Sequence, residues 1–148
     1  MKNFSFNLIS FSDRCEKWRD QIVESSEENC HKALSWISNL SARGNSCTLD
    51  ALKEAFNDQE IEAIYLITDG KPDSSTKLVL DEVRKLNARR NLIINVISFN
   101  CDDKSANYFL STLASENYGR FHKTSKSDND IHLFAHKILT EGIQESYV

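Results

Sequence analysis

Two short apolar runs, separated by a stretch with helical periodicity, constrain the fold of this sequence more than any other feature. The first run is AIYLI at residues 63–67, and the second is LIINVISF at residues 92–99. Both are short and rich in branched apolar residues, which is typical of strands that are buried on both faces. Residues 78–86, between the runs, carry apolar side chains at helical spacing. This order predicts two parallel strands joined by a helical crossover.

The rest of the sequence continues the alternation. Residues 4–11 alternate apolar and polar side chains and predict a strand. Ser25 and Glu28 have the spacing of a capping box, and Thr48 can cap a second, shorter helix. The other predicted elements are helices at 25–40, 48–56, 106–114 and 131–139 and a weak strand at 118–122. We therefore expect an α/β fold with a mostly parallel sheet and helices on both faces.

The composition limits the class of protein. The chain has 148 residues, of which 40% are hydrophobic and 27% charged, and this fits one domain over residues 1–148. Its 18 Lys and Arg against 22 Asp and Glu give a net charge of −4, so we expect no nucleic-acid binding. No apolar stretch approaches the roughly 20 residues that span a bilayer. The first ten residues also lack the pattern of a secretory signal.

The four cysteines bear on the cellular compartment. Cys15, Cys30, Cys47 and Cys101 are far apart and form no CxxC pair, so we expect no zinc site. Free thiols in a reducing compartment are the simplest interpretation, and they indicate a cytoplasmic, intracellular protein. Two disulfides in a secreted fragment are the alternative.

Asp69 is the residue most clearly placed for chemistry. It follows the predicted buried strand at 63–67, and ligands of open α/β sheets bind where strands end. A carboxylate in this position can bind a cation if neighbouring hydroxyls complete an oxygen shell, and Ser46 and Thr48 are candidates for those hydroxyls. The alternative is that Asp69 and Gly70 only form a turn.

Three stretches, FNLISFS, GNSCTLDAL and IYLITDGKPD, resemble the von Willebrand factor A domain. The stretches KPDSS and WISNLSARGNSCTLDAL resemble the intracellular domain-containing-protein-3 group of that family. The resemblance extends from the family's second strand to its final helix. It implies a three-layer, Rossmann-like fold and a metal-ion-dependent adhesion site, where Mg²⁺ binds an acidic residue of a partner. It also implies binding rather than catalysis.

The residues that would form this metal site are only partly present. The family joins a DxSxS loop, a threonine in a GTNT-like loop and the aspartate of a TDG turn. By resemblance, Asp69 is that aspartate and Ser46, rather than Thr48, stands at the threonine. No DxSxS occurs in the sequence, and Mg²⁺ demands near-octahedral oxygen geometry. We expect no cofactor and no tight metal binding by this chain alone, unless a DxSxS segment is supplied.

The same resemblance implies that the chain lacks the family's first strand and first helix. In the family that strand is central to the sheet, so its loss would expose strand edges and apolar surface. We therefore interpret the chain as a shortened isoform, a partial gene model or a fragment.

Two functions are consistent with these features. The first is an intracellular, non-catalytic protein-interaction module with an unknown protein partner. Its recognition face would be formed by Ser46, Thr48, Asp69 and Lys71. The second is a Mg-dependent phosphate-handling or hydrolase-like domain with Asp69 as phosphoacceptor or nucleophile. That chemistry requires a further acidic cluster and a cation to hold the phosphate. Asp102 and Asp103 follow a different predicted strand, and Lys71 and Lys104 are only generically placed.

Overall fold

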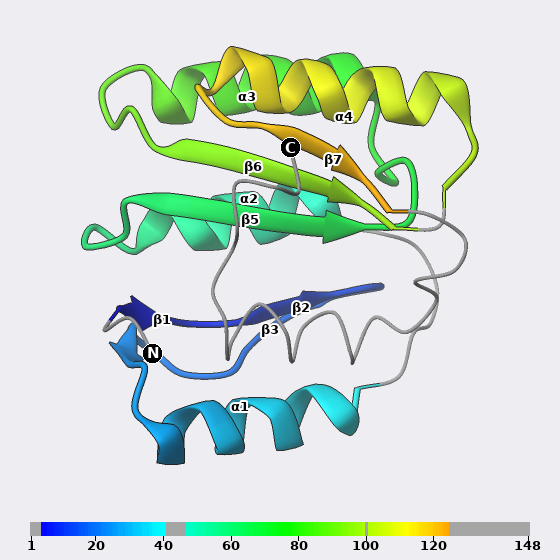
Figure 1. Cartoon of the computed structure of the whole chain (residues 1–148). Coiled ribbons are helices and arrows are strands. Elements are labelled where there is room, and N and C mark those ends of the chain that lie inside the picture. The colour runs from blue at the N-terminus through cyan, green and yellow to red at the C-terminus, as the bar shows by residue number, and fades with distance from the viewer. Residues whose placement is uncertain (1–3, 41–46, 100, 125–148) are drawn as a thin grey trace.

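A parallel three-stranded sheet forms the centre of the molecule (Figure 1). The computed structural model describes residues 4–40, 47–99 and 101–124. The strands, in the order β5-β6-β7, are β5 (Ala63–Thr68), β6 (Ile93–Ser98) and β7 (Phe121–Lys123). Ala63 lies opposite Ile93, and Val96 lies opposite Phe121. The α/β class and the parallel pairing of the two apolar runs are confirmed.

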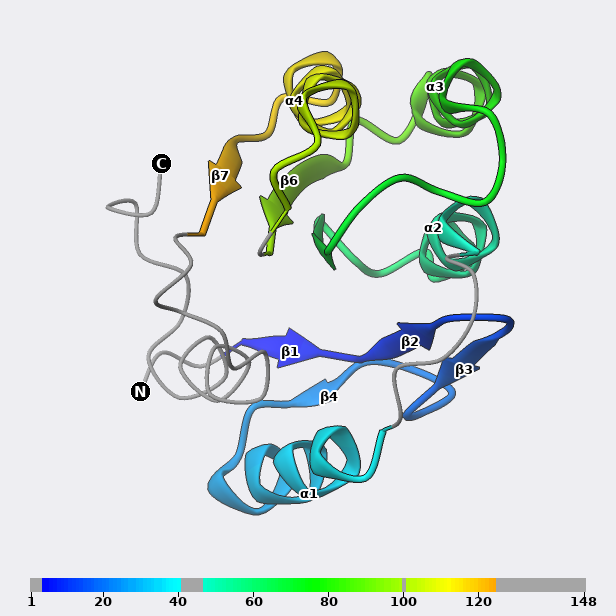
Figure 2. The ribbon, with the colours of Figure 1, turned by 90° about the vertical axis from the view of Figure 1, so that its right-hand side faces the viewer.

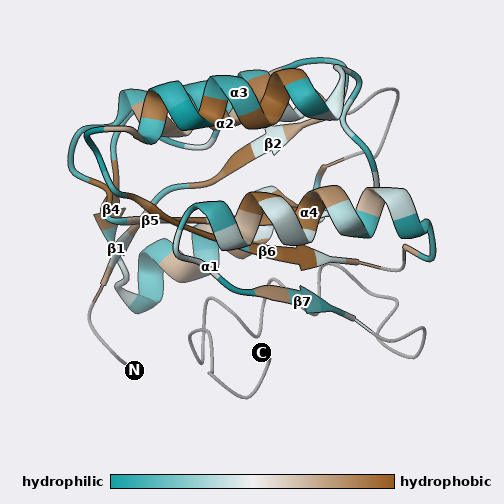
Figure 3. Ribbon diagram, turned by 90° about the horizontal axis from the view of Figure 1, so that it is seen from above, coloured by the Kyte–Doolittle hydropathy of each residue, from teal (hydrophilic) through white to brown (hydrophobic). Residues whose placement is uncertain are grey.

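Three helices pack against this sheet. They are α2 (Thr48–Asn57), α3 (Thr76–Asn87) and α4 (Lys104–Glu116). Figure 2 shows all three on one side of the sheet, with α4 over β6 and β7. Figure 3 shows the reason for this packing: each helix carries apolar residues along one face and hydrophilic residues along the opposite face. The helix predicted at 131–139 lies outside the described residues.

The hydrophobic core lies between the sheet and these helices. Val79, Ile94, Val96 and Leu113 are each 0% exposed. Every buried member of this core comes from the region between Leu49 and Ala114. The rest of the cluster consists of Leu49, Leu52, Phe56, Leu66, Val83, Leu92, Phe109, Leu110 and Ala114. The crossovers required by parallel strands therefore supply both the connections and the core.

The amino-terminal region forms a separate antiparallel hairpin. Its strands are β1 (Ser5–Phe6), β2 (Ile9–Phe11), β3 (Cys15–Lys17) and β4 (Val23–Glu24). β1 pairs with β4, and β2 pairs with β3. The predicted strand at 4–11 is present, interrupted at two residues. The returning strands were missed because their sequence, from Cys15 to Glu24, has no apolar alternation.

Helix α1 (Glu27–Ser38) follows the hairpin and lies on its far side from the sheet (Figure 1). Its cap is Ser26, whose Oγ accepts a hydrogen bond from the Asn29 N–H at 3.1 Å. The predicted cap, Ser25, is wrong by one position. Ser25 is instead buried, and its Oγ accepts a hydrogen bond from the Phe4 N–H at 3.0 Å.

The start of α2 also differs from the prediction. Cys47 occupies the cap position, but its side chain makes no capping hydrogen bond to the helix, and Thr48 is the first helical residue. At the other end of the domain, Tyr118 has a φ of 60°, so the chain is still turning there and β7 begins only at Phe121. Both corrections concern where an element begins, not whether it exists.

Two polar contacts join the ends of the helices. Asn87 Nδ2 donates to Leu92 O and to Asn117 Oδ1, both at 2.9 Å, which ties α3 to the turn after α4. Arg90 Nη1 donates to Phe56 O at 2.6 Å, close to the end of α2. The Arg90 guanidinium thus satisfies backbone carbonyl groups at the end of α2.

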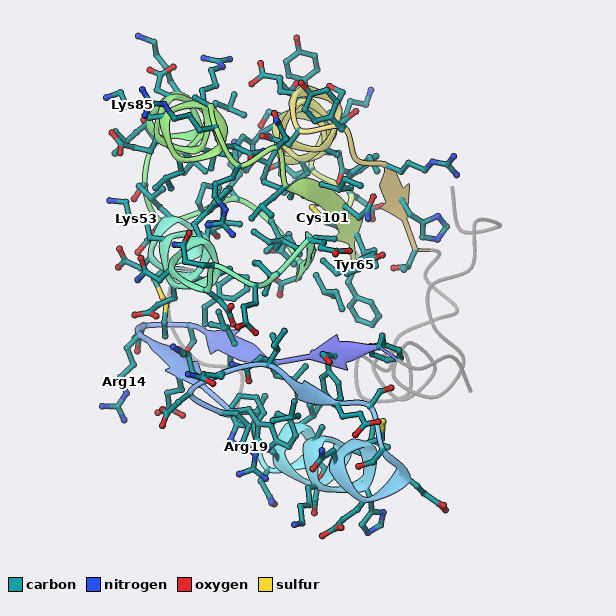
Figure 4. All side chains as sticks on the ribbon, turned by 90° about the vertical axis from the view of Figure 1, so that its left-hand side faces the viewer. Arg14, Arg19, Lys53, Tyr65, Lys85 and Cys101 are labelled. Atoms are coloured by element: carbon teal, nitrogen blue, oxygen red, sulfur yellow. The ribbon has the colours of Figure 1, made fainter. Side chains whose placement is uncertain are left out.

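β5 forms one edge of the parallel sheet among the described residues. The N–H groups of Ile93 and Phe99 donate to Glu62 O at 3.3 Å and Thr68 O at 2.8 Å, respectively. The even-numbered residues of β5 therefore face β6, and the backbone groups of the odd-numbered residues point to the opposite edge. The odd-numbered residues are Ala63, Tyr65 and Ile67. In Figure 4, the side chain of Tyr65, 47% exposed, extends into the region between β5 and the hairpin.

Candidate functional site

The carboxyl ends of β5, β6 and β7 lie at the same end of the molecule, and the first residues of α2 lie there too (Figure 1). This follows from the parallel pairing, because parallel strands all end on one side of the sheet. The loops after these strands carry the candidate residues. We refer to Asp69, Lys71, Asp102, Asp103 and Lys123 as the carboxyl edge.

Asp69 lies at the end of β5, as the sequence predicts. The preceding residue, Thr68, is 5% exposed, and its carbonyl oxygen accepts a hydrogen bond from the Phe99 N–H at 2.8 Å. Thr68 Oγ1 also lies 3.4 Å from both the N and the O of Gly70. Asp69 itself is exposed, and the structure gives it no hydrogen bond or ion pair with another described residue. The turn thus exposes the Asp69 carboxylate to solvent, directly after a residue that is held in the sheet by its hydrogen bond to Phe99.

Lys71 is exposed, and its Nζ lies 3.8 Å from Asp103 Oδ2. This ion pair links the loop after β5 to the start of α4. Hydrogen bonds from Ala106 N and Ser105 Oγ, together with Lys71, hold the pKa of Asp103 below its ordinary value. The sequence contained a signal for the capping hydrogen bonds of Asp103, because this residue stands directly before a helical pattern, but it contained none for the ion pair with Lys71.

A second ion pair links the loop after β6 to the end of β7. Lys123 Nζ lies 3.6 Å from Asp102 Oδ1. Sequence reasoning assigned no role to Lys123, because its partner comes from a different strand end. With two of its acids paired, the carboxyl edge leaves Asp69 as its carboxylate without an ion pair to a described residue.

The remaining predicted site residues are placed less favourably. Thr48 is 1% exposed, so its hydroxyl is covered by the protein. Ser46 lies outside the described residues. Among residues 4–40, 47–99 and 101–124, no three His, Cys, Asp or Glu side chains are grouped so that they could hold a metal ion. The described donors at this edge therefore do not fit Mg²⁺, which requires several oxygen ligands in octahedral geometry.

Two open depressions in the described surface lie elsewhere. One is lined by the first turns of α1, including His31 and Lys32. The other lies between the turn of the hairpin and the end of α1, where Ser12 and Asn39 contribute to the lining. Neither includes a residue of the carboxyl edge, so the depressions do not extend the candidate site.

Comparison with known proteins agrees with this fold. A family model described as "von Willebrand factor type A domain" matches residues 1–123. Human von Willebrand factor A domain-containing protein 3A is 43% identical over 138 residues, which cover 93% of this chain and 12% of that protein. Its human relative 3B is 41% identical over 117 residues, which cover 79% of this chain and 9% of that protein. The chain thus spans only about an eighth or less of these relatives.

A solved structure extends the likeness to the fold. The von Willebrand factor type A protein from Catenulispora acidiphila matches with a TM-score of 0.76 at 14% identity, over 96% of this chain and 34% of that one. Within the part of the chain that the structure describes, no helix is long and apolar enough to cross a membrane. The family match over most of the residues and the two relatives above 40% identity lead to one conclusion. The chain belongs to the von Willebrand factor type A domain family.

Proposed function

We propose that this chain is an intracellular, non-catalytic protein-interaction module that contacts its partner through the carboxyl edge. One observation carries the proposal. Asp69 is an exposed carboxylate at the end of a strand in the buried sheet, without an ion pair to a described residue. The position is rigid because Thr68 is paired on β6, and a fixed charge loses little entropy when a partner binds it. The other candidate residues of this face are Ser46, by the family resemblance, and the exposed Lys71, whereas Thr48 is 1% exposed and is covered by the protein.

The charges at this edge suggest the chemistry of the partner. Without a metal, the Asp69 carboxylate repels an acidic residue and attracts a lysine, an arginine or an N–H donor. Lys71 is held at 3.8 Å from Asp103, which leaves it less available to bind a partner's acid. The partner therefore contributes a basic or hydrogen-bond-donating group to Asp69.

The same proposal includes an incomplete metal-ion-dependent adhesion site, which binds Mg²⁺ weakly or not at all. The support is the sequence itself, which contains no DxSxS to supply a second carboxylate and two hydroxyls to Mg²⁺. Titration calorimetry with MgCl₂ and MnCl₂ tests it, and a dissociation constant in the low micromolar range would reject it.

We also propose that the domain is incomplete without one further strand beside β5. The support is the edge of β5, which no other described strand pairs with and where Ala63, Tyr65 and Ile67 direct backbone groups away from β6. An open edge of this kind is a template for another strand. Fusing a strand that ends in a DxSxS loop to the amino terminus should raise both the thermal stability and the Mg²⁺ affinity. Unchanged values for both would argue against the proposal.

The recognition face is tested by a matched pair of charge changes. Asp69→Asn and Asp20→Asn each remove one exposed carboxylate, the first at the carboxyl edge and the second in the hairpin. Proteins captured from a cell extract by each variant are quantified by mass spectrometry. We expect Asp69→Asn to reduce capture of specific partners about tenfold, the effect of losing one charge-assisted hydrogen bond. Asp20→Asn should leave capture unchanged. Equal capture by both variants would remove Asp69 from the face.

The enzyme alternative is tested separately. Acetyl phosphate with Mg²⁺ labels an aspartate that serves as a phosphoacceptor, and peptide mapping locates the label. We expect no label on Asp69, because the described residues beside it provide no acidic cluster for Mg²⁺. Stoichiometric labelling of Asp69 would favour the enzyme.

A further inference from the structure

Two cysteines that are far apart in the sequence meet where the hairpin contacts α2. Cys15 belongs to β3, and Cys47 is the cap residue of α2, 32 positions later. Their sulfur atoms lie 3.2 Å apart, and Cys15 Sγ is 3.7 Å from Cys47 O. Both thiols are free. We propose that Cys15 and Cys47 are a redox modification site, which forms a disulfide that fastens the hairpin to α2.

The backbone around the pair fixes this geometry. The Cys47 N–H donates a hydrogen bond to Ser12 O at 3.0 Å, which holds the start of α2 against the turn of the hairpin. Cys15 pairs with Phe11 across that turn, and Phe11 packs against the hydrophobic core. A disulfide has a sulfur–sulfur distance of about 2.0 Å, so the two sulfurs need to approach by only about 1 Å. Rotation of the two side chains about their Cα–Cβ bonds brings the sulfurs together.

The surroundings of the two thiols determine which reacts first and how fast. Cys47 is 4% exposed, and Cys15 is partly exposed, so a reagent reaches Cys15 more easily. Burial, the hydrogen bond with Cys47 and the nearby acids Asp50 and Glu54 raise the pKa of Cys15 to about 12. The nearby cation Lys17 is itself paired with one of these acids, because its Nζ lies 3.7 Å from Glu54 Oε2. Little thiolate is present at neutral pH, so oxidation is slow and needs a sustained oxidising environment.

The oxidant required is a small-molecule disulfide, for which glutathione disulfide is the probe. The Cys15 thiolate attacks one glutathione sulfur, which forms a mixed disulfide and releases one glutathione thiolate. Cys47 then loses its proton and attacks the Cys15 sulfur, which releases the second glutathione. The protein loses two protons and two electrons, and one glutathione disulfide becomes two glutathione thiols. The buried position of Cys47 next to Cys15 favours this second step over a lasting adduct.

The disulfide would connect α2, which belongs to the hydrophobic core cluster, to the hairpin, whose described residues contribute only the partly buried Phe11 to that cluster. Its closed loop contains the returning hairpin strand, α1 and the segment before α2. Cross-linking a loop of this length restricts the unfolded chain and stabilises the folded one. The oxidised protein should therefore unfold at a temperature about 5 to 10 °C higher than the reduced protein.

The experiment uses the full chain in its native buffer, incubated with glutathione disulfide, quenched in acid and analysed by intact mass and non-reducing peptide mapping. We expect a mass loss of about 2 Da, a peptide joining Cys15 to Cys47, and reversal by dithiothreitol. The melting temperature is measured before and after oxidation.

Cysteine variants provide the controls. Cys47→Ser should abolish the loss of mass and leave a glutathione adduct on Cys15, whereas Cys30→Ser, a buried cysteine in α1, should oxidise like the original chain. A lasting adduct on the unsubstituted chain, or a link that includes Cys30 or Cys101, would overturn the proposal. The mapping on the unsubstituted chain decides this even if a variant does not fold.

Discussion

The two parts of this molecule are held together in different ways. The region from Leu49 to Ala114 supplies every buried residue of the hydrophobic core cluster, including side chains that are 0% exposed. The hairpin and α1 contribute one partly buried residue, Phe11, to that cluster. Among the described residues, the parallel part is stabilised by this core. The hairpin is held by strand pairing, by the stacked rings of Phe6 and Trp18, and by the adjoining helix α1, in which Ala33 is 0% exposed. The difference indicates that stability is uneven, with local opening easiest in the hairpin.

The largest expected effect is at Gly119, between α4 and β7. A Cβ atom placed there would lie 1.7 Å from Ile94 O, which is backbone of the central strand. Gly119→Ala therefore forces the β7 turn away from β6, and we expect a loss of about 4 kcal/mol in the free energy of unfolding, measured in urea. Gly70→Ala is the control, because nothing lies within 4 Å of the added Cβ. A loss below about 1 kcal/mol for Gly119→Ala would show that the parallel part is not rigid.

The second prediction compares the same substitution in the two parts. Leu113 in α4 is 0% exposed, and Leu34 in α1 is only partly buried. Leu113→Ala leaves a cavity in the core and should lower the free energy of unfolding by about 3 kcal/mol. Leu34→Ala should cost about 1 kcal/mol, since less apolar area is lost from burial. Native-state hydrogen exchange should show faster exchange in β1–β4 for Leu34→Ala, while the β6 amides stay protected. Equal losses would contradict the comparison.

The smallest expected change in stability comes from removing a polar side chain, either a buried one in the parallel part or an exposed one in α1. Asn87 donates to Leu92 O and accepts from the Leu92 N–H at 2.7 Å, within the parallel part. Asn87→Ala leaves these backbone groups without a partner and should cost about 2 kcal/mol. Asn39, at the end of α1, makes an exposed contact with Ser35 O at 3.1 Å, so Asn39→Ala should cost less than about 0.5 kcal/mol. Thermal unfolding of the two variants measures the difference, and a reversed order would mean that water replaces the Asn87 contacts.

Local sequence patterns predicted much of the fold, but mostly the part that is buried. The apolar runs of β5 and β6 and the periodic faces of α3 and α4 carry their own signals, because burial on two faces or one stripe restricts residue type. The strands β3 and β4 carry none, since a half-exposed hairpin strand tolerates polar residues such as Glu16 and Lys17. The cap of α1 was displaced by one residue because Ser25 and Ser26 are equally suitable in sequence.

The candidate site likewise has a part that the sequence predicted and a part that it did not. Asp69 could be predicted because a strand and the turn that ends it are adjacent in the sequence. The partners of Lys71 and Lys123 could not, because they come from the loop after β6. A sequence gives the order of strand ends but not the distance between their loops. Ser46 stays a prediction, since it lies outside the described residues.

The sequence by itself determined the alternation of strands and helices, the acid at the end of β5 and the likeness to the von Willebrand factor A domain. These depend on residues that are close in the chain, where periodicity and turn chemistry act directly. Only the tertiary structure decided that Cys15 meets Cys47, that Arg90 binds the carbonyl groups at the end of α2, and that β5 is an edge strand among the described residues. Each of these depends on how distant segments of the chain pack together and not on any local pattern.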